Sequence, residues 1–144
     1  MFRFLYIILI VLVFSSLYGQ NTANISVHMS DVEINNSELH IGLYDNEYNF
    51  KHKSGAIDSI ILIPTTSIVK LLFKDVPIGN YAIATFQDLN NNGKLDVKKF
   101  KIPTEPIGIS NYPIGNSKLP PTFNKAKFKI TGDTLIIIPL VHVK

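Results

Sequence analysis

One stretch of the chain joins an apolar segment to a polar loop, and it reads Tyr81-Ala82-Ile83-Ala84-Thr85-Phe86-Gln87-Asp88-Leu89-Asn90-Asn91-Asn92-Gly93-Lys94-Leu95-Asp96. Its first seven residues predict a β-strand. The nine that follow carry side-chain oxygens at Asp88, Asn90, Asn92 and Asp96 around Gly93. Alternate side chains of such a loop point inward, and a glycine at the sixth place lets the backbone turn sharply. The stretch therefore predicts a cation-binding loop at the end of a strand.

Short apolar segments with period-two alternation surround this stretch on both sides. They are residues 25–30, 39–44, 59–63, 68–73, 126–130 and 135–143, separated by turn signals such as 35–37, 76–80 and 131–134. Only residues 48–54 suggest a helical turn. About seven strands at this spacing predict an all-β fold, an antiparallel β-sandwich of the immunoglobulin-like or transthyretin-like kind.

Residues 97–122 behave differently, because they contain five prolines and show no sustained periodicity. We expect one long proline-rich loop here, and structureless loops of that length tend to be functional.

The first residues are typical of an export signal. Arg3 precedes an apolar run over residues 4–14, and small or polar residues follow up to Gly19 and Gln20. This pattern predicts a signal peptide over 1–19 and a single β-sandwich domain over 20–144. The run is too short to span a bilayer unaided, so we expect no stable membrane anchor after cleavage. The predicted location is the periplasm, the outer surface or the secreted fraction.

Composition excludes several other classes of protein and site. The chain has no cysteine, which excludes disulfides and thiolate metal ligands. Without Arg3, 13 Lys and Arg residues stand against 11 Asp and Glu residues, a net charge of +2. The cluster Lys98, Lys99 and Lys101 is too small for a nucleic-acid footprint, so no nucleic-acid partner is expected.

The polar loop matches most, but not all, of an EF-hand-type calcium loop. Asp88, Asn90 and Asn92 fill its first, third and fifth positions, the Lys94 carbonyl its seventh and Asp96 its ninth. Lys99 stands at the twelfth position, where a glutamate normally closes the shell. A carboxylate from elsewhere would have to close it, and Glu105 is the only acid in residues 97–122. Oxygen-only ligation favours calcium over zinc or copper, and magnesium is less favoured because it keeps several waters.

Other interpretations of these residues stay open. Asn, Asp and Gly also gather in plain hairpin turns. Paired carboxylates serve general acid–base catalysis, so a glycan-acting hydrolase using Asp88, Asp96 or Glu105 is one alternative. No nucleophile elbow or phosphate-cradling loop is present, and we assign no catalytic residue. His28 and His40 would lie close together if their two strands paired, although two imidazoles make a weak metal site.

The chain from Val76 to Phe128 resembles a bacterial family of exported proteins, domain of unknown function 2141. The matching pieces are Pro77-x-Gly79-x-Tyr81, Phe86-x-Asp88-x-Asn90-x-Asn92-Gly93-Lys94-Leu95-Asp96, Ile102-Pro103-Thr104-Glu105, Gly108-x-Ser110-Asn111 and Pro121-x-Phe123-x-x-Ala126-x-Phe128. The resemblance implies an exported β-sandwich with no established activity. It also pairs the aspartate–asparagine loop with the Pro-Thr-Glu element, which supports Glu105 as a member of the site.

Together these features predict an exported, non-enzymatic binding or structural module with a calcium site that ties two loops together. Its partner would be a protein or glycan ligand that the sequence does not identify. A protein-interaction module that pairs through a sheet edge is a further alternative.

Overall fold

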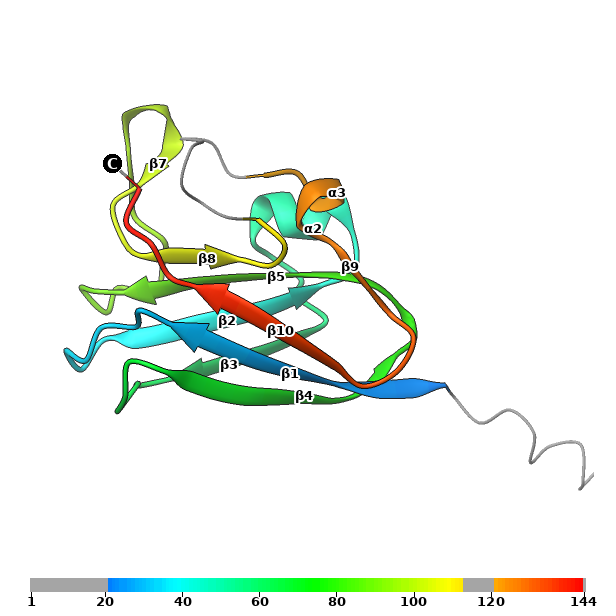
Figure 1. Cartoon of the computed structure of the whole chain (residues 1–144). Helices are drawn as coiled ribbons and strands as arrows, with labels where there is room; N and C mark the ends of the chain where they lie inside the picture. Colours follow the sequence, from blue (N-terminus) through cyan, green and yellow to red (C-terminus); the bar gives the residue numbers. More distant parts are fainter. Residues whose placement is uncertain (1–20, 113–120, 144) are drawn as a thin grey trace, which may run out of the picture.

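The computed structural model describes residues 21–112 and 121–143, and in this part most of the strands form two facing sheets (Figure 1). The smaller sheet has the order β10-β1-β4, and the larger has the order β3-β2-β5-β8 with β9 added beside β5. The strands of the smaller sheet are β1 (Thr22–Ser30), β4 (Val69–Pro77) and β10 (Thr134–Pro139). Those of the larger sheet are β2 (Glu38–Tyr44), β3 (Asp58–Leu62), β5 (Gly79–Asp88), β8 (Ile107–Ile109) and β9 (Phe128–Ile130). The predicted all-β sandwich is confirmed.

The core lies between the two sheets and follows the alternation of the sequence. In β1 every second residue is buried, and the same parity in β2 and β5 points inward. The central core side chains are Ile25, Val27, Met29, Leu39, Ile41, Leu43, Phe73, Ile83, Ile130 and Ile138. Burying one such side chain stabilises the fold by about 1.5–3 kcal/mol.

Strand β4 extends beyond the predicted 68–73, because a β-bulge restores the alternation of side chains that face the core. Phe73 and Val76 both point into the core although they are three residues apart. Asp75 takes a left-handed φ of 52°, and its N–H donates to Asn24 Oδ1 at 3.2 Å. The pairing with β1 shifts register at this point. One extra residue therefore turns Val76 inward again and lets the strand continue to Pro77.

The sequence predicted purely antiparallel sheets, but β1 and β10 pair in parallel. The expected 131–134 turn is present, but it carries the chain from β9 in the larger sheet to β10 in the smaller one. Asp133 in this turn accepts the N–H of Asn24 at 2.8 Å, which fixes the crossing beside β1. β10 ends at Pro139, and among the described residues beyond it Val141 makes the one bridge, to Ile107.

The prediction of one structureless loop over 97–122 is wrong for its described part. Residues 97–103 form β6 (Val97–Lys98), a 3-10 turn η1 (Lys99–Lys101) and β7 (Ile102–Pro103), and β6 pairs with β7. β8 follows and pairs with β5. Isolated two- and three-residue strands are too short to produce a visible period in the sequence. Residues 113–120 lie outside the described residues.

Two short helices cover one end of the larger sheet's outer face (Figure 1). The helical turn expected near 48–54 is α2 (Glu47–His52), which Asn46 caps by accepting the N–H of Asn49 at 2.9 Å. α3 (Phe123–Ala126) was not expected. Both helices pack with Tyr44, Phe50, Ala82 and Ala84 into a second apolar cluster, separate from the core between the sheets. None of the helices in the described part of the chain is long and apolar enough to cross a membrane.

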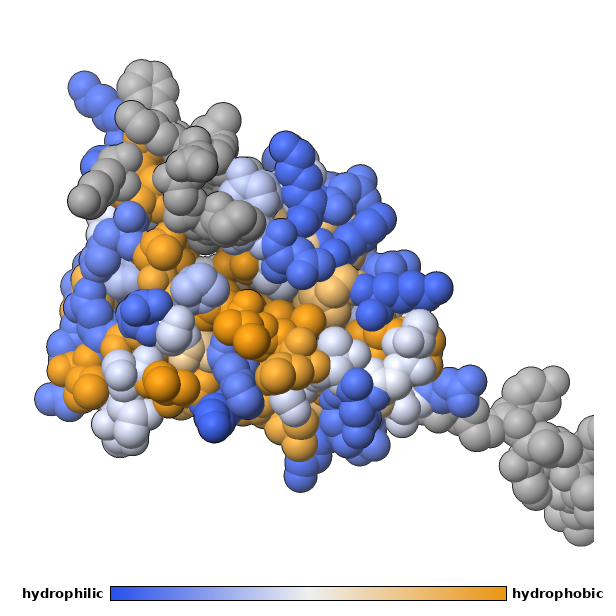
Figure 2. Space-filling view, in the orientation of Figure 1, coloured by the Kyte–Doolittle hydropathy of each residue, from blue (hydrophilic) through white to orange (hydrophobic). Residues whose placement is uncertain are grey.

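His28 and His40 would lie close together only if their strands paired, and that condition is not met. His28 lies on β1 and His40 on β2, and these strands belong to different sheets. The exposed face of the smaller sheet instead carries apolar side chains, and Figure 2 shows them gathered over β10. Leu135 and Ile137 on β10 and Leu72 on β4 contribute to this face.

Gly108 on β8 is tightly surrounded by side chains of β5 and β10. A Cβ built on this residue would lie 2.6 Å from Ile138 Cγ2 and 2.8 Å from Thr85 Cγ2. Gly108→Ala should therefore overpack the core and lower the free energy of unfolding by about 1–3 kcal/mol in urea denaturation. Gly132→Ala is the matched control, because a Cβ there meets nothing within 4 Å. Equal stability of the two variants would contradict this packing.

Candidate functional site

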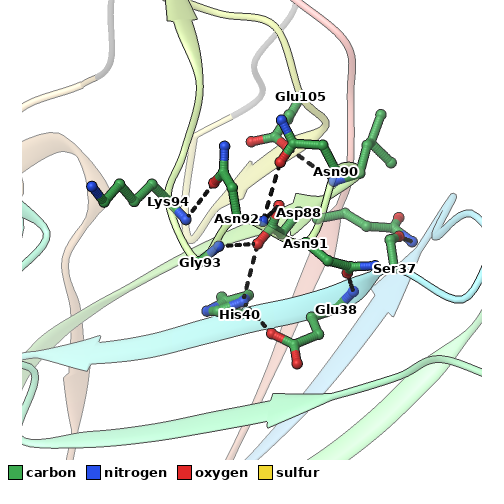
Figure 3. A network of polar contacts seen from close by, with 12 residues as sticks. Ser37, Glu38, His40, Asp88, Asn90, Asn91, Asn92, Gly93, Lys94 and Glu105 are labelled. Atoms are coloured by element: carbon green, nitrogen blue, oxygen red, sulfur yellow. Dashed lines mark hydrogen bonds and ion pairs between the residues drawn. The ribbon is translucent and has the colours of Figure 1, made fainter.

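The site begins at Asp88, the last residue of β5, whose side chain is completely buried. Its Oδ1 accepts the N–H of Asn92 at 3.1 Å, and its Oδ2 accepts the N–H of Gly93 at 2.6 Å (Figure 3). The backbone thus curls around the carboxylate. Asn91 and Gly93 take left-handed φ values of 54° and 77°, conformations that suit these two residue types. The sharp turn predicted at Gly93 is confirmed.

Asn90, Asn92 and Asp96 converge within the loop. Asp96 Oδ2 accepts the side-chain amide of Asn90 at 2.7 Å and that of Asn92 at 3.0 Å. The amide oxygens face backbone donors instead: Asn90 Oδ1 accepts the N–H of Asn92, and Asn92 Oδ1 accepts the N–H of Lys94 at 2.8 Å. The three side chains therefore form a closed hydrogen-bonded set on the solvent side of the loop.

Glu105 is brought to this loop, as the sequence predicted. It is 4% exposed, its Oε1 accepts the N–H of Leu89 at 2.9 Å, and its Oε2 accepts the N–H of Asp96 at 3.0 Å. These two donors stand near the two ends of the segment 88–96. One carboxylate thus holds both ends of the loop and joins them to the segment before β8.

The β6–β7 hairpin explains how a residue nine positions beyond Asp96 reaches it. Val97 pairs with Pro103, so the chain leaves and returns at neighbouring points. Thr104 then donates both its N–H, at 3.0 Å, and its hydroxyl, at 3.2 Å, to the Asp96 carbonyl. The hairpin therefore sets Glu105 down beside the loop.

Gln87 is a member of this region that the sequence analysis did not identify. It is fully buried, and its side chain ties the loop between β1 and β2. Nε2 donates to the Glu33 carbonyl at 2.6 Å and to Ser37 Oγ at 2.9 Å, while Oε1 accepts the N–H of Glu33 at 2.9 Å. The sequence could have indicated this role, because the alternation of β5 places Gln87 on the same core-facing side as Tyr81 and Ile83.

His40 is a second residue that the sequence analysis did not place here. Its ring stacks on Phe86, with centroids 4.7 Å apart, and its Nε2 lies 3.0 Å from Glu38 Oε2 and 3.8 Å from Asp88 Oδ2. Glu38, His40 and Asp88 are the one group of three or more acidic, histidine or cysteine ligands within the described residues whose donor atoms all lie within 4.8 Å of one another. Direct pairing of Glu38 with Asp88 across β2 and β5 creates this arrangement.

The side chains predicted as calcium ligands lie in one region, where they bond to one another and to backbone N–H groups. Two oxygens on one calcium, each about 2.4 Å from it, lie at most about 4.8 Å apart. Asp88, Asp96 and Glu105 do not form such a group among the described residues. Asn90, Asn92 and Asp96 do converge, but with the amide nitrogens inward. Both amides would have to rotate to present oxygen, a change that terminal amide groups make readily.

The fold and the site define an all-β sandwich with a polar, hydrogen-bonded loop cluster at one end. The chain belongs to the family described as "Uncharacterized protein conserved in bacteria (DUF2141)", whose model matches residues 27–137. The matched region contains every residue of the loop cluster. Searches of curated proteins and of solved structures find no significant match.

We call the Glu105 carboxylate with its bonds to the N–H groups of Leu89 and Asp96 the Glu105 clamp. It gives a direct stability prediction. Glu105→Gln replaces one acceptor oxygen with an amide N–H₂ that faces a backbone donor, which should lower the free energy of unfolding by about 1.5–3 kcal/mol. Glu38→Gln is the matched control, because Glu38 is partly exposed and its contact with His40 contributes less than about 1 kcal/mol. Urea denaturation of both variants checks this. A loss of unfolding free energy in Glu105→Gln no larger than that in Glu38→Gln would contradict the role given to Glu105.

Proposed function

We propose that the chain is an exported, non-enzymatic binding or structural module in which the Asp88 loop and the Glu105 segment act as one unit. The observation that carries the proposal is the Glu105 carboxylate, which accepts the N–H of Leu89 and of Asp96. A clamp of this kind fixes the shape of a loop end, and binding residues are commonly carried on loops that a rigid scaffold positions.

Export is part of the proposal and rests on the N-terminal sequence. Residues 1–20 lie outside the described residues, so the signal peptide over 1–19 stays a prediction. Export with cleavage near Gly19 predicts a mature chain that begins at or close to Gln20, in the periplasm, on the outer surface or secreted. N-terminal sequencing of the exported form tests this, and a retained Met1 would contradict it.

Calcium is the ion that we propose for the loop. The candidate donors are the side chains of Asp88, Asn90, Asn92, Asp96 and Glu105 with the Lys94 carbonyl, all of them oxygen donors. Support comes from the backbone, which already wraps Asp88, and from the convergence of Asn90 and Asn92 on Asp96. Against this, ion binding must exchange several internal hydrogen bonds. We therefore expect weak binding, in the millimolar to sub-millimolar range typical of extracellular modules.

The calcium proposal predicts a melting temperature that depends on the ion. At about 1 mM calcium and a dissociation constant of about 0.1 mM, the ion would add about 1.4 kcal/mol. For a domain of this size, that amounts to a rise of about 5 °C over a chelator. Asp96→Asn should reduce this rise strongly, while Asp58→Asn, an exposed acid on β3, should leave it intact. Calorimetric titration gives the affinity of each variant.

An unchanged melting temperature between calcium and chelator would contradict the calcium part of the proposal. A rise with zinc but not with calcium would point to Glu38, His40 and Asp88, since imidazole nitrogen suits zinc. Either result leaves the Glu105 clamp in place, because its hydrogen bonds need no ion.

Of the alternatives, protein interaction has one supporting observation, the exposed Leu135 and Ile137 on the outer face of β10. The glycan-acting hydrolase would use Asp88 or Glu105 as acid or base. Both oxygens of each of these carboxylates already accept backbone N–H groups. The hydrolase stays a prediction without a supporting observation.

A further inference from the structure

A groove of about 710 Å³ crosses the outer face of the larger sheet. One end is formed by the last residue of α2 and the segment after it, residues 52–56, and the other by residues 93–95 of the Asp88 loop together with Pro103. The volume lies within the range of about 300–1,000 Å³ that is usual for small-molecule sites. Of the proposed ion ligands, Lys94 is the one among the lining residues described, and its proposed donor is the backbone carbonyl.

The centre of the groove floor carries two small residues. Gly42 on β2 stands directly opposite Ala84 on β5, and the ring of Tyr44 lies over Gly42. Apolar side chains flank the groove, with Ile61 on β3 at one side and Ile107 and Ile109 on β8 at the other. The surface thus offers an apolar bed on which an aliphatic or aromatic body can lie.

Tyr44 places a polar group above this bed. The residue is only 6% exposed, and a Cβ on Gly42 would lie 2.7 Å from its hydroxyl oxygen, so the hydroxyl stands over Gly42. Among the described residues the hydroxyl donates to no acceptor. Burial raises the pKa of Tyr44, which keeps its proton in place. A ligand acceptor atom in the groove can receive this hydrogen bond.

Apart from Tyr44, the ionisable side chains described as lining the groove are all basic. Its titratable lining residues, apart from Tyr44, are His40, His52, Lys53 and Lys94, and no Asp or Glu stands among the lining residues described. His40 is already engaged by Glu38 and lies near Asp88, so the positive potential is best placed at the α2 end.

Lys53 supplies the positive charge at that end. Left-handed backbone at the end of α2, with φ 51°, returns its side chain over the helix. Nζ donates to the Phe50 carbonyl at 2.6 Å and stands 5.8 Å from the centre of the Tyr44 ring. Burial lowers the pKa of Lys53 to about 8, although Glu47 acts in the opposite direction. A bound anion would favour the charged ammonium.

We propose that the groove binds a small amphipathic carboxylate, with its anionic head at the Tyr44 hydroxyl and Lys53 and its apolar body along the sheet toward Leu95. Charge complementarity and the unused hydroxyl donor select the head group. The small floor residues and the flanking isoleucines select the body. The proposal does not depend on calcium, because no proposed calcium side-chain ligand lines the groove.

The test compares three eight-carbon probes that differ only in the head group: octanoate, octan-1-ol and octylammonium. Titrations of the purified chain are followed by calorimetry and by backbone amide shifts, with calcium and with a chelator. We expect octanoate to bind and to shift the amides of Gly42, Lys53 and Leu95, with octan-1-ol at least tenfold weaker and octylammonium weaker still. Equal affinity for octanoate and octan-1-ol, shifts confined to other surfaces, or no binding of octanoate would overturn the proposal.

Variants then test the placement of the head group. Lys53→Gln should weaken octanoate binding about tenfold, and Tyr44→Phe, which keeps the packed ring, about threefold. Lys70→Gln, on the smaller sheet, should change it less than twofold, and Lys94→Gln, at the opposite end of the groove, should weaken it less than Lys53→Gln does. Amide spectra of every variant confirm that it is folded. A loss with Lys94→Gln as large as that with Lys53→Gln, or none with Lys53→Gln and Tyr44→Phe, would overturn the assigned orientation.

Discussion

Two buried carboxylates, satisfied by backbone N–H groups, organise the end of this sandwich that carries the candidate site. An ionised carboxylate without partners in a protein interior costs many kcal/mol, so each must be compensated. Asp88 receives the N–H groups of Asn92 and Gly93, and Glu105 receives those of Leu89 and Asp96. All four donors lie within one nine-residue segment. The two charges therefore require the loop to keep a single shape.

Strand β5 connects this loop end to the rest of the molecule. Its inward parity supplies core residues and then Gln87, whose amide secures the loop between β1 and β2. Its outward parity supplies Ala84 in the groove floor, Phe86 beneath His40, and finally Asp88. One strand thus builds the core on one face and both candidate ligand regions on the other.

Sequence patterns could predict whatever depends on local chemistry. Alternation located most of the longer strands, the glycine spacing located the sharp turn at Gly93, and the missing glutamate at Lys99 pointed to Glu105. Long-range pairing was beyond reach, because β1 and β10 become parallel neighbours only after the chain changes sheets. Glu105 was expected as an ion ligand, but the structure shows a hydrogen-bond acceptor. Either role needs the same carboxylate at the same place, so sequence alone could not separate them.

Native-state hydrogen exchange at the Leu89 and Asp96 amides tests the central role of the Glu105 carboxylate most directly. Both amides belong to a loop, where exchange is normally fast, yet both donate to a buried carboxylate. We predict strong protection of these two amides without any added ion, and its loss in Glu105→Ala while core amides such as that of Ile83 stay protected. Fast exchange at Leu89 and Asp96 in the unaltered chain would contradict the account.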